Sequence, residues 1–391
     1  MADLGRCPHA DNCGGCSYQG VEYEYQLSNK EGEVRGLFIH AELDPDKFDG
    51  IEGCPEEYRY GYRNKMEYTF GDMVKDGPLC LGMHKPGQFM SVTTVDHCQI
   101  IDQDFNVILR YTLDFATERG YIKYHKRRHT GLLRNLVIRK GERTGELLIN
   151  IVTSSQGEFE DEAWKIGLLD LSLNNTIVGI MHTINDSVAD KVTCEELRML
   201  YGREYYMEKI FDLTFKVHEF SFFQTNVEAV ERLYSEAIDL IDDFSGKNVF
   251  DLYCGTGTIS QVMARRAAHV LGIEIVPESI DVAKENAEVN GIENCEFICG
   301  DVFETLSACQ EMPDVIVVDP PRVGIGDKAV EKIAAYEVPQ IVYISCNPKT
   351  LVKDLALFTQ LGYDITYVKP FDNFPMTKHV ETVVLMSRVK E

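Results

Sequence analysis

After position 246 the chain alternates between short apolar segments and helical ones, and this rhythm limits the possible folds more than any other feature. Apolar segments of strand length lie at 248–253, 269–275, 295–299, 314–319 and 340–346. Helical patterns separate them, for example over 277–290. Strands that alternate with helices form a parallel sheet with helices on both faces. We therefore expect an α/β fold with a Rossmann-like, doubly wound sheet here.

A glycine turn follows the first of these strands. Gly255 and Gly257 precede a helical segment, and glycine lets a ligand approach the backbone where a Cβ would clash. A dinucleotide-binding turn requires a third glycine at position 260, where this chain has Ser260. Nicotinamide cofactors are therefore disfavoured.

Two carboxylates stand at the ends of the first two strands. Asp251 and Glu274 are both expected at the carboxyl edge of the sheet, where ligands of such folds bind. Glu274 can accept hydrogen bonds from both hydroxyls of a ribose. This pair resembles the S-adenosylmethionine site of class I methyltransferases, and the resemblance extends from about Phe222 to the end of the sequence.

The next two strand ends carry candidate reaction residues. Asp319-Pro-Pro-Arg322 ends the fourth strand, and many amino-methylating enzymes have an aromatic ring where this chain has Arg322. The fifth strand ends at Cys346. C5 of uracil is a poor nucleophile until a thiolate adds to C6. Release of the thiol then requires a general base, and Glu381 at the start of an apolar segment is the candidate.

These motifs together resemble the uracil-5-methyltransferases of ribosomal and transfer RNA. The matching segments are Ser221-Phe-Phe-Gln-Thr-Asn226, 251–257, Asp319-Pro-Pro-Arg322, Ser345-Cys-Asn-Pro348 and His379-Val-Glu381. The resemblance implies Cys346 as the nucleophile and Glu381 as the proton acceptor. It also implies a cofactor site for S-adenosylmethionine, with these candidate residues: Gln224, Tyr253, Gly255, Gly257, Thr258, Glu274, Asp301 and Asp319.

Four of the twelve cysteines form a candidate metal site, since cytosolic thiols stay reduced unless a metal or a reaction uses them. Cys7, Cys13 and Cys16 lie in one glycine-rich segment, and Cys98 is the fourth. Four thiolates can bind zinc or an iron–sulfur cluster, and their spacing leaves both open. The ribosomal RNA branch of the family carries a [4Fe–4S] cluster on a similar pattern, so the resemblance favours the cluster.

Short alternating segments between about 58 and 215 predict a smaller, mainly antiparallel β domain. We expect three domains: a cysteine-rich loop and helix over 1–57, an RNA-binding β domain over 58–218 and a catalytic domain over 219–391. Only six residues precede Cys7, where many family members have an oligonucleotide-binding barrel. RNA recognition is therefore expected on the β domain.

The net charge of −24 argues against nucleic-acid binding, which normally depends on clustered Lys and Arg. A local basic patch can overcome this, and one is expected at 123–143. The cations of this patch are Lys123, Lys126, Arg127, Arg128, Arg134, Arg139, Lys140 and Arg143. A second candidate RNA-binding group consists of Arg63, Asn64 and Lys65. Phe222 and Phe223 are candidates for stacking on an extruded base.

The expected partner is RNA, with ribosomal RNA favoured and the T-loop of transfer RNA as the alternative. A catalytically silent RNA-binding or ribosome-assembly protein would lack Cys346 or Glu381, and both are present. We expect a cytoplasmic monomer without membrane association, because no secretion signal is recognisable and no run of about eighteen apolar residues occurs.

Overall fold

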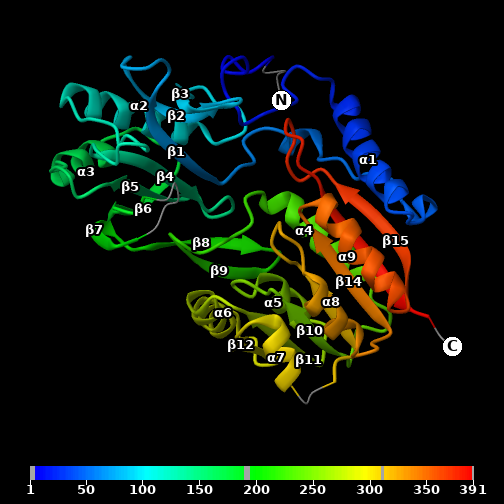
Figure 1. The fold of residues 1–391 in the computed structure, drawn as a ribbon. Helices are drawn as coiled ribbons and strands as arrows, with labels where there is room; N and C mark the ends of the chain where they lie inside the picture. Colours follow the sequence, from blue (N-terminus) through cyan, green and yellow to red (C-terminus); the bar gives the residue numbers. More distant parts are fainter. Residues whose placement is uncertain (1–4, 189–193, 310–311, 390–391) are drawn as a thin grey trace. The chain divides into compact units, whose positions relative to one another are not determined.

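The computed structural model describes residues 5–188, 194–309 and 312–389 (Figure 1). The chain divides into two units. The first unit comprises residues 1–20, 57–209 and 217–220, and the second comprises 21–56, 210–216 and 221–391. The division passes through a two-stranded sheet of β8 (Tyr205–Ile210) and β9 (Leu213–His218).

The first unit contains a seven-stranded sheet in the order β2-β3-β1-β4-β5-β6-β7. Its strands are β1 (Lys65–Asp72), β2 (Leu79–Lys85), β3 (Gln88–Thr94), β4 (Leu133–Lys140), β5 (Glu146–Thr153), β6 (Thr176–Ile184) and β7 (Glu196–Gly202). Most neighbours are antiparallel, but β1 and β3 run parallel, as do β5 and β6. Helix α3 (Asp161–Leu169) lies between these two in sequence, and α2 (Gln103–Glu118) follows β3.

The second unit contains a seven-stranded sheet in the order β12-β11-β10-β13-β14-β16-β15. Its strands are β10 (Asn248–Leu252), β11 (His269–Glu274), β12 (Cys295–Cys299), β13 (Val315–Val318), β14 (Gln340–Ser345), β15 (Tyr363–Phe371) and β16 (Glu381–Arg388). The first five are parallel, and β16 runs antiparallel to both of its neighbours. The expected α/β class with a second, mainly antiparallel sheet is confirmed.

Helices join the strands of the second unit. They are α4 (Val227–Asp239), α5 (Thr258–Ala264), α6 (Pro277–Asn290), α7 (Val302–Ala308), α8 (Asp327–Ala334) and α9 (Pro348–Gln360). Their apolar sides and the strands form one core, in which Phe250, Ile316 and Ile341 are buried. Among the residues described, no helix is both long and apolar enough to cross a membrane.

The helix expected near 21–40 is α1 (Tyr23–His40), and it belongs to the second unit. Val34 and Phe38 are completely buried and join the core of the parallel sheet. Two further α1 residues, Gln26 and Lys30, are also buried despite their polarity. This helix therefore packs on the same core that supports the candidate active site.

Candidate active site

The first cofactor residue at the sheet edge is Asp251, which is fully buried at the end of β10. Ser260 Oγ donates a hydrogen bond to Asp251 Oδ2. Asp251 Oδ1 has no hydrogen-bond partner within the described part of the chain. Burial raises the pKa of Asp251 to about 7, and the Ser260 hydrogen bond opposes this rise. A buried acceptor without a partner requires a donor from elsewhere, such as a ligand.

The turn after β10 has the conformation that its glycines predict. Gly255 has a φ of 54° and Gly257, the N-cap of α5, has a φ of 72°. A Cβ on Gly257 would lie 2.7 Å from the Phe297 ring, whereas a Cβ on Gly255 would meet no atom within 4 Å. The turn is thus tightly packed at Gly257 and open at Gly255. Tyr253 also has a positive φ, of 69°.

Glu274 is held against this turn by two backbone groups. Its Oε2 accepts a hydrogen bond from Gly255 N at 3.1 Å, and its Oε1 accepts one from Val276 N at 3.0 Å. Both bonds fix the orientation of the carboxylate. Each oxygen can accept a further hydrogen bond, so a fixed carboxylate is available to a ligand at the open turn.

The other candidate cofactor residues lie on three segments. Thr258 is the buried first residue of α5. Asp301 follows β12 and caps α7, where its Oδ1 accepts a hydrogen bond from Glu304 N at 3.2 Å. Gln224 Nε2 donates to Tyr234 Oη at 3.5 Å. Sequence reasoning did not identify Tyr234, because a tyrosine at an apolar position of a helix is indistinguishable from core.

Tyr234 belongs to the carboxylate site. Burial raises its pKa well above the usual value, and the charges of Asp319, Asp251 and Glu381 add to the rise. Asp319 and Glu381 are buried too, and burial raises their pKa values to about 7 and about 8, respectively. Their mutual repulsion contributes to the shift at Glu381. Three buried carboxyl groups in one site favour a cationic ligand.

The candidate nucleophile and base lie at the same end of neighbouring strands. Ser345 at the end of β14 pairs with Thr382 of β16, so Cys346 and Glu381 each lie one residue beyond this pair. Burial raises the pKa of the Cys346 thiol to about 12, with contributions from Glu381 and Asp319. The positive charge of Arg322 opposes the rise. The structure thus brings Cys346, Glu381, Asp319 and Arg322 together.

Arg322 is connected to both sides of this group. Its carbonyl oxygen accepts a hydrogen bond from Asn347 Nδ2 at 2.7 Å, next to Cys346. Its Nη2 lies 3.4 Å from Nδ1 of His379, two residues before Glu381. Arg322 therefore contacts both the segment that carries Cys346 and the segment that leads to Glu381.

The candidate metal site lies in the first unit. Cys7, Cys13, Cys16 and Cys98 line one cavity, together with His9. Gly15 N donates to Cys13 Sγ at 3.4 Å. Burial raises the pKa of Cys16 to about 11 and of Cys98 to about 12, and the neighbouring thiols add to both. Among the described residues, no three of these sulfur atoms lie within 4.8 Å of one another.

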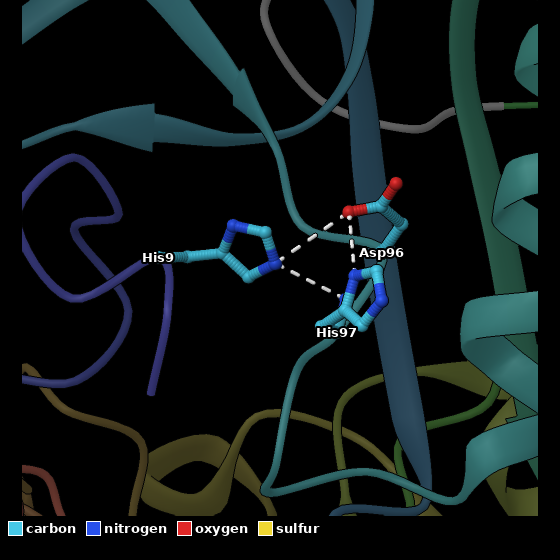
Figure 2. Close-up of side chains that lie close together, drawn as sticks. All are labelled: His9, Asp96 and His97. Carbon is cyan, nitrogen blue, oxygen red and sulfur yellow. Dashed lines mark hydrogen bonds and ion pairs between the residues drawn. The ribbon is translucent and has the colours of Figure 1, made fainter. Parts of the chain in front are cut away.

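A second group, His9, Asp96 and His97, connects the two cysteine segments (Figure 2). His9 Nε2 accepts a hydrogen bond from His97 N at 3.1 Å and lies 3.6 Å from Asp96 Oδ1. Asp96 also pairs with Arg110 at 3.1 Å. The His9 nitrogen already accepts a hydrogen bond, and Asp96 faces a guanidinium. We therefore interpret this group as a set of structural contacts that stabilise the cavity.

The predicted basic patch is smaller than expected. Three of the predicted cations are buried: Arg134, Arg139 and Lys140. The prediction that they contact RNA is therefore wrong. Arg134 Nη1 donates to Asn185 O at 2.9 Å, and Lys140 pairs with Asp102 at 2.7 Å. Burial arises because β4 is a central strand whose residues are covered on both faces.

The second candidate group is also partly internal, and so are the paired phenylalanines. Asn64 is buried, and Lys65 pairs with Glu67 at 2.6 Å. Phe223 is buried against Phe215, with ring centroids 6.0 Å apart, so only Phe222 of the two phenylalanines is exposed. The β domain therefore offers fewer free cations to RNA than composition indicates.

Exposed basic groups persist around Arg127 and Arg128. No carboxylate of the described residues pairs with either one within 4.0 Å. Lys126 Nζ lies 4.7 Å above the Phe89 ring, which is 55% exposed. Phe89 also stacks on His84, at 5.4 Å between centroids. An exposed ring beside cations is suited to a nucleic-acid base and its phosphates.

The sheet order, its reversed strand β16 and the paired carboxylates at the glycine turn define a class I, S-adenosylmethionine-dependent methyltransferase. A family model described as tRNA (Uracil-5-)-methyltransferase matches residues 161–389. The chain belongs to this family of RNA methyltransferases.

Relatives and solved structures agree with this assignment. The chain is 47% identical over 383 residues to an uncharacterized RNA methyltransferase of Clostridium tetani, covering 98% of this chain and 84% of the relative. A similar relative of Staphylococcus aureus is 34% identical over 385 residues, covering 97% and 83%. The structure of Pyrococcus abyssi tRNA (uracil-54, C5)-methyltransferase with S-adenosyl-L-homocysteine has a TM-score of 0.79 and 26% identity, covering 97% of this chain and 86% of that one.

Proposed function

We propose that this chain methylates C5 of a uridine in ribosomal RNA, with Cys346 as the covalent nucleophile and Glu381 as the general base. The observation that carries the proposal is the placement of a thiol and a buried carboxyl group at adjacent ends of β14 and β16. Both groups lie in the carboxylate site of a methyltransferase fold, and the family description names uracil C5.

The residues of the glycine turn fit S-adenosylmethionine. Glu274 is oriented to accept the ribose hydroxyls, and Asp251 offers a buried oxygen without a partner among the described residues. Gln224, Tyr253, Thr258, Asp301 and Asp319 complete the proposed binding set, with Gly255 leaving room for the ligand. The buried carboxyl groups favour its sulfonium charge.

Replacing Glu274 by alanine is expected to raise the dissociation constant of S-adenosylhomocysteine at least tenfold. Loss of charge-assisted hydrogen bonds to two hydroxyls costs about 1.5–3 kcal/mol. Calorimetric titration measures this change, and Glu288→Ala, at the exposed far end of α6, is the matched control. Equal affinities of wild type and Glu274→Ala would mean that Glu274 does not bind the ribose.

The proposed reaction assigns one task to each residue. The Cys346 thiol gives its proton to water, a step that the charge of Arg322 favours, and its sulfur forms a bond to C6 of the uracil. The C5–C6 electron pair moves toward O4 and makes C5 nucleophilic. When bound, S-adenosylmethionine would supply the methyl group to C5 and leave as S-adenosylhomocysteine. Glu381 then removes the C5 proton, the C5–C6 double bond re-forms, and Cys346 departs as a thiolate.

We also propose that Cys7, Cys13, Cys16 and Cys98 bind a [4Fe–4S] cluster. Thiolates on one tetrahedral zinc ion would lie about 3.8 Å apart, given zinc–sulfur bonds of about 2.3 Å. Among the described residues, no three of the four sulfur atoms meet within 4.8 Å of one another. This spacing supports a cluster, in which each cysteine binds a different iron.

Protein purified without oxygen is expected to contain iron and sulfide at about four of each per chain. Cys13→Ser should lose most of both, because one of the four ligands is missing. Cys80→Ser is the matched control, since Cys80 lies on β2 and does not line the cavity. Elemental analysis and absorption spectra measure the content, and stoichiometric zinc without iron would refute the cluster.

Reversing Arg127 and Arg128 to glutamate is expected to weaken RNA binding and to flatten its dependence on salt. Cations that contact phosphates release counterions, so their loss reduces the slope of affinity against salt concentration. Reversal of two exposed lysines elsewhere, Lys47 and Lys284, provides a charge-matched control. If affinity and slope match the wild type, residues 126–128 form only a solvated loop.

The choice of ribosomal RNA depends on the resemblance of the four cysteines to the ribosomal branch of the family. A transfer RNA T-loop is the second candidate, because the similar Pyrococcus abyssi enzyme is described as acting on uracil 54 of transfer RNA. Mapping 5-methyluridine in total RNA from cells with and without this gene separates them. Loss from transfer RNA alone would overturn the ribosomal assignment.

A further inference from the structure

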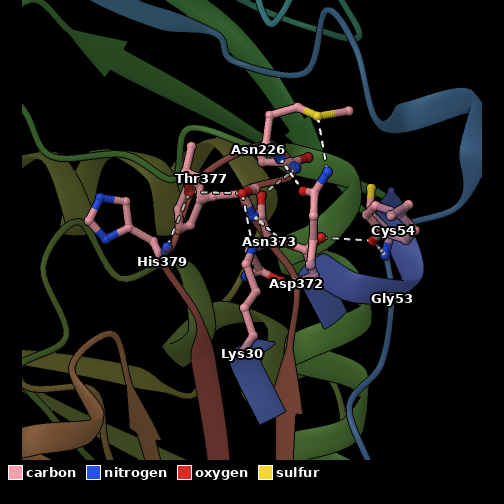
Figure 3. Close-up of polar contacts among 12 residues, drawn as sticks. Lys30, Gly53, Cys54, Asn226, Asp372, Asn373, Thr377 and His379 are labelled. Atoms are coloured by element: carbon pink, nitrogen blue, oxygen red, sulfur yellow. Dashed lines mark hydrogen bonds and ion pairs between the residues drawn. The ribbon is translucent and has the colours of Figure 1, made fainter. Parts of the chain in front are cut away.

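Helix α1 lies outside the segment matched by the family model, yet it contacts the loop that leads to Glu381. Lys30 and Asp372 form an ion pair whose side chains are both 0% exposed. Lys30 Nζ lies 2.5 Å from Asp372 Oδ1 and 3.2 Å from Phe374 O (Figure 3). A buried lysine is costly unless it is paired, so its contacts select one conformation of this loop.

Two other residues on the same face of α1 hold the loop. Tyr23 Oη donates to Asp372 Oδ2 at 2.7 Å and accepts from Cys54 N at 2.6 Å. Gln26 Oε1 accepts from Met376 N at 3.0 Å. Residues 23, 26 and 30 share one face because a helix repeats every three to four residues. Both ends of the segment 372–376 are thus attached to α1.

The loop passes this restraint to the base through hydrogen bonds. Phe374 O, which accepts from Lys30, also accepts from Thr377 Oγ1 at 2.8 Å. Thr377 Oγ1 in turn accepts from His379 N at 3.2 Å, two residues before Glu381 (Figure 3). A chain of hydrogen bonds therefore links Lys30 to His379, two residues before the start of β16.

The same loop also contacts the segment that carries Gln224. Asn226 Nδ2 donates to Asn373 O at 2.7 Å, and Asn226 Oδ1 caps α4 through Ala229 N at 3.2 Å. The loop therefore lies between the proposed cofactor segment and the proposed base. Phe371, which directly precedes Asp372, pairs with Glu381 across β15 and β16, so a displacement of the loop would shift the Glu381 end of β16 relative to Cys346.

We propose that Lys30, through Asp372 and Phe374, is a positioning residue that aligns Glu381 for removal of the C5 proton. The inference rests on the proposed function, because it assigns a structural origin to the geometry of the base. It concerns the late step of the reaction. Attack by Cys346 and cofactor binding at Glu274 depend on β14 and β11 and are expected to survive without the ion pair.

The test uses the double variant Lys30→Met/Asp372→Asn in the full-length protein. It removes both charges together, so no unpaired charge is buried; the asparagine oxygen can still accept from Phe374 N, while its amide nitrogen can donate to Tyr23 Oη. We expect turnover to fall at least tenfold, with the affinity for S-adenosylhomocysteine changed less than threefold. A covalent enzyme–RNA species should accumulate on denaturing gels and disappear when Cys346→Ala is added.

Two further variants serve as controls for this test. Thr377→Val breaks the relay without touching α1 and should show the same accumulation, whereas Arg35→Met on α1, outside the relay, should match the wild type. Turnover within twofold of the wild type in the double variant, or turnover lost together with cofactor binding and without an adduct, would overturn the positioning role. Glu381→Gln runs in parallel, and its failure to form an adduct would instead refute the proposed function.

Discussion

Replacing Cys346 by alanine is expected to abolish methylation and to prevent any covalent enzyme–RNA species. Without a thiolate at C6, C5 does not become nucleophilic and the methyl group has no acceptor. The affinity for S-adenosylhomocysteine should stay close to that of the wild type, since Glu274 and Asp251 lie on other strands. Transfer of a radioactive methyl group to RNA measures methylation, and denaturing gels detect the covalent enzyme–RNA species.

Cys309→Ala provides the matched control, because Cys309 is half-buried behind α7 and away from the strand ends. It should methylate RNA like the wild type. Methylation above background by Cys346→Ala would show that another group attacks C6 or that no covalent step occurs.

Replacing Glu381 by glutamine is expected to cause the opposite failure. Attack by Cys346 and methyl transfer can proceed, but the C5 proton leaves slowly and the thiolate cannot be expelled before it does. Enzyme, RNA and methylated base should accumulate as one species that migrates slowly on a denaturing gel. That band should vanish in the Cys346→Ala background. Turnover at the wild-type rate without a band would mean that another group is the base.

The pH dependence of this step adds a quantitative check. Burial raises the pKa of Glu381 to about 8, and only its ionised form accepts a proton. Adduct breakdown in the wild type should therefore accelerate as pH rises toward 8 and level off above it. The Glu381→Gln variant should lack this rise.

The strand–helix alternation after Gly246 predicted β10 to β14 closely. The central strands β10, β13 and β14 are buried on both faces and therefore almost continuously apolar, whereas in the edge strand β12 only Phe297 is buried. The apolar pattern could not predict in which direction a strand runs within the sheet. β16 is as apolar as β14 but runs the other way, and β5 runs parallel to β6 within an otherwise mainly antiparallel sheet. Strand direction depends on connections in space, which a local apolar pattern does not encode.

The proposed reaction residues could be found in the sequence because Asp319 and Cys346 directly follow strands, Glu381 begins one, and all three lie in specific motifs. The Lys30–Asp372 ion pair could not be predicted from the sequence, since 342 positions separate its members. Along α1 the buried positions are Gln26, Lys30, Val34 and Phe38, so half of the buried face is polar and resembles a solvated one. The burial of the cations on β4 could not be predicted either, because their partners come from segments that are distant in the sequence.

The position of β16 bears on how the enzyme is made. β16 follows every other strand of its sheet along the chain, yet it lies between β14 and β15. A growing chain that has not yet reached Glu381 already contains the glycine turn and Cys346, but β15 has no strand to pair with. The strand that completes the sheet thus begins with the proposed base. With Glu381 in that role, a nascent chain would acquire the capacity to release its RNA only when the last strand of the sheet has been made.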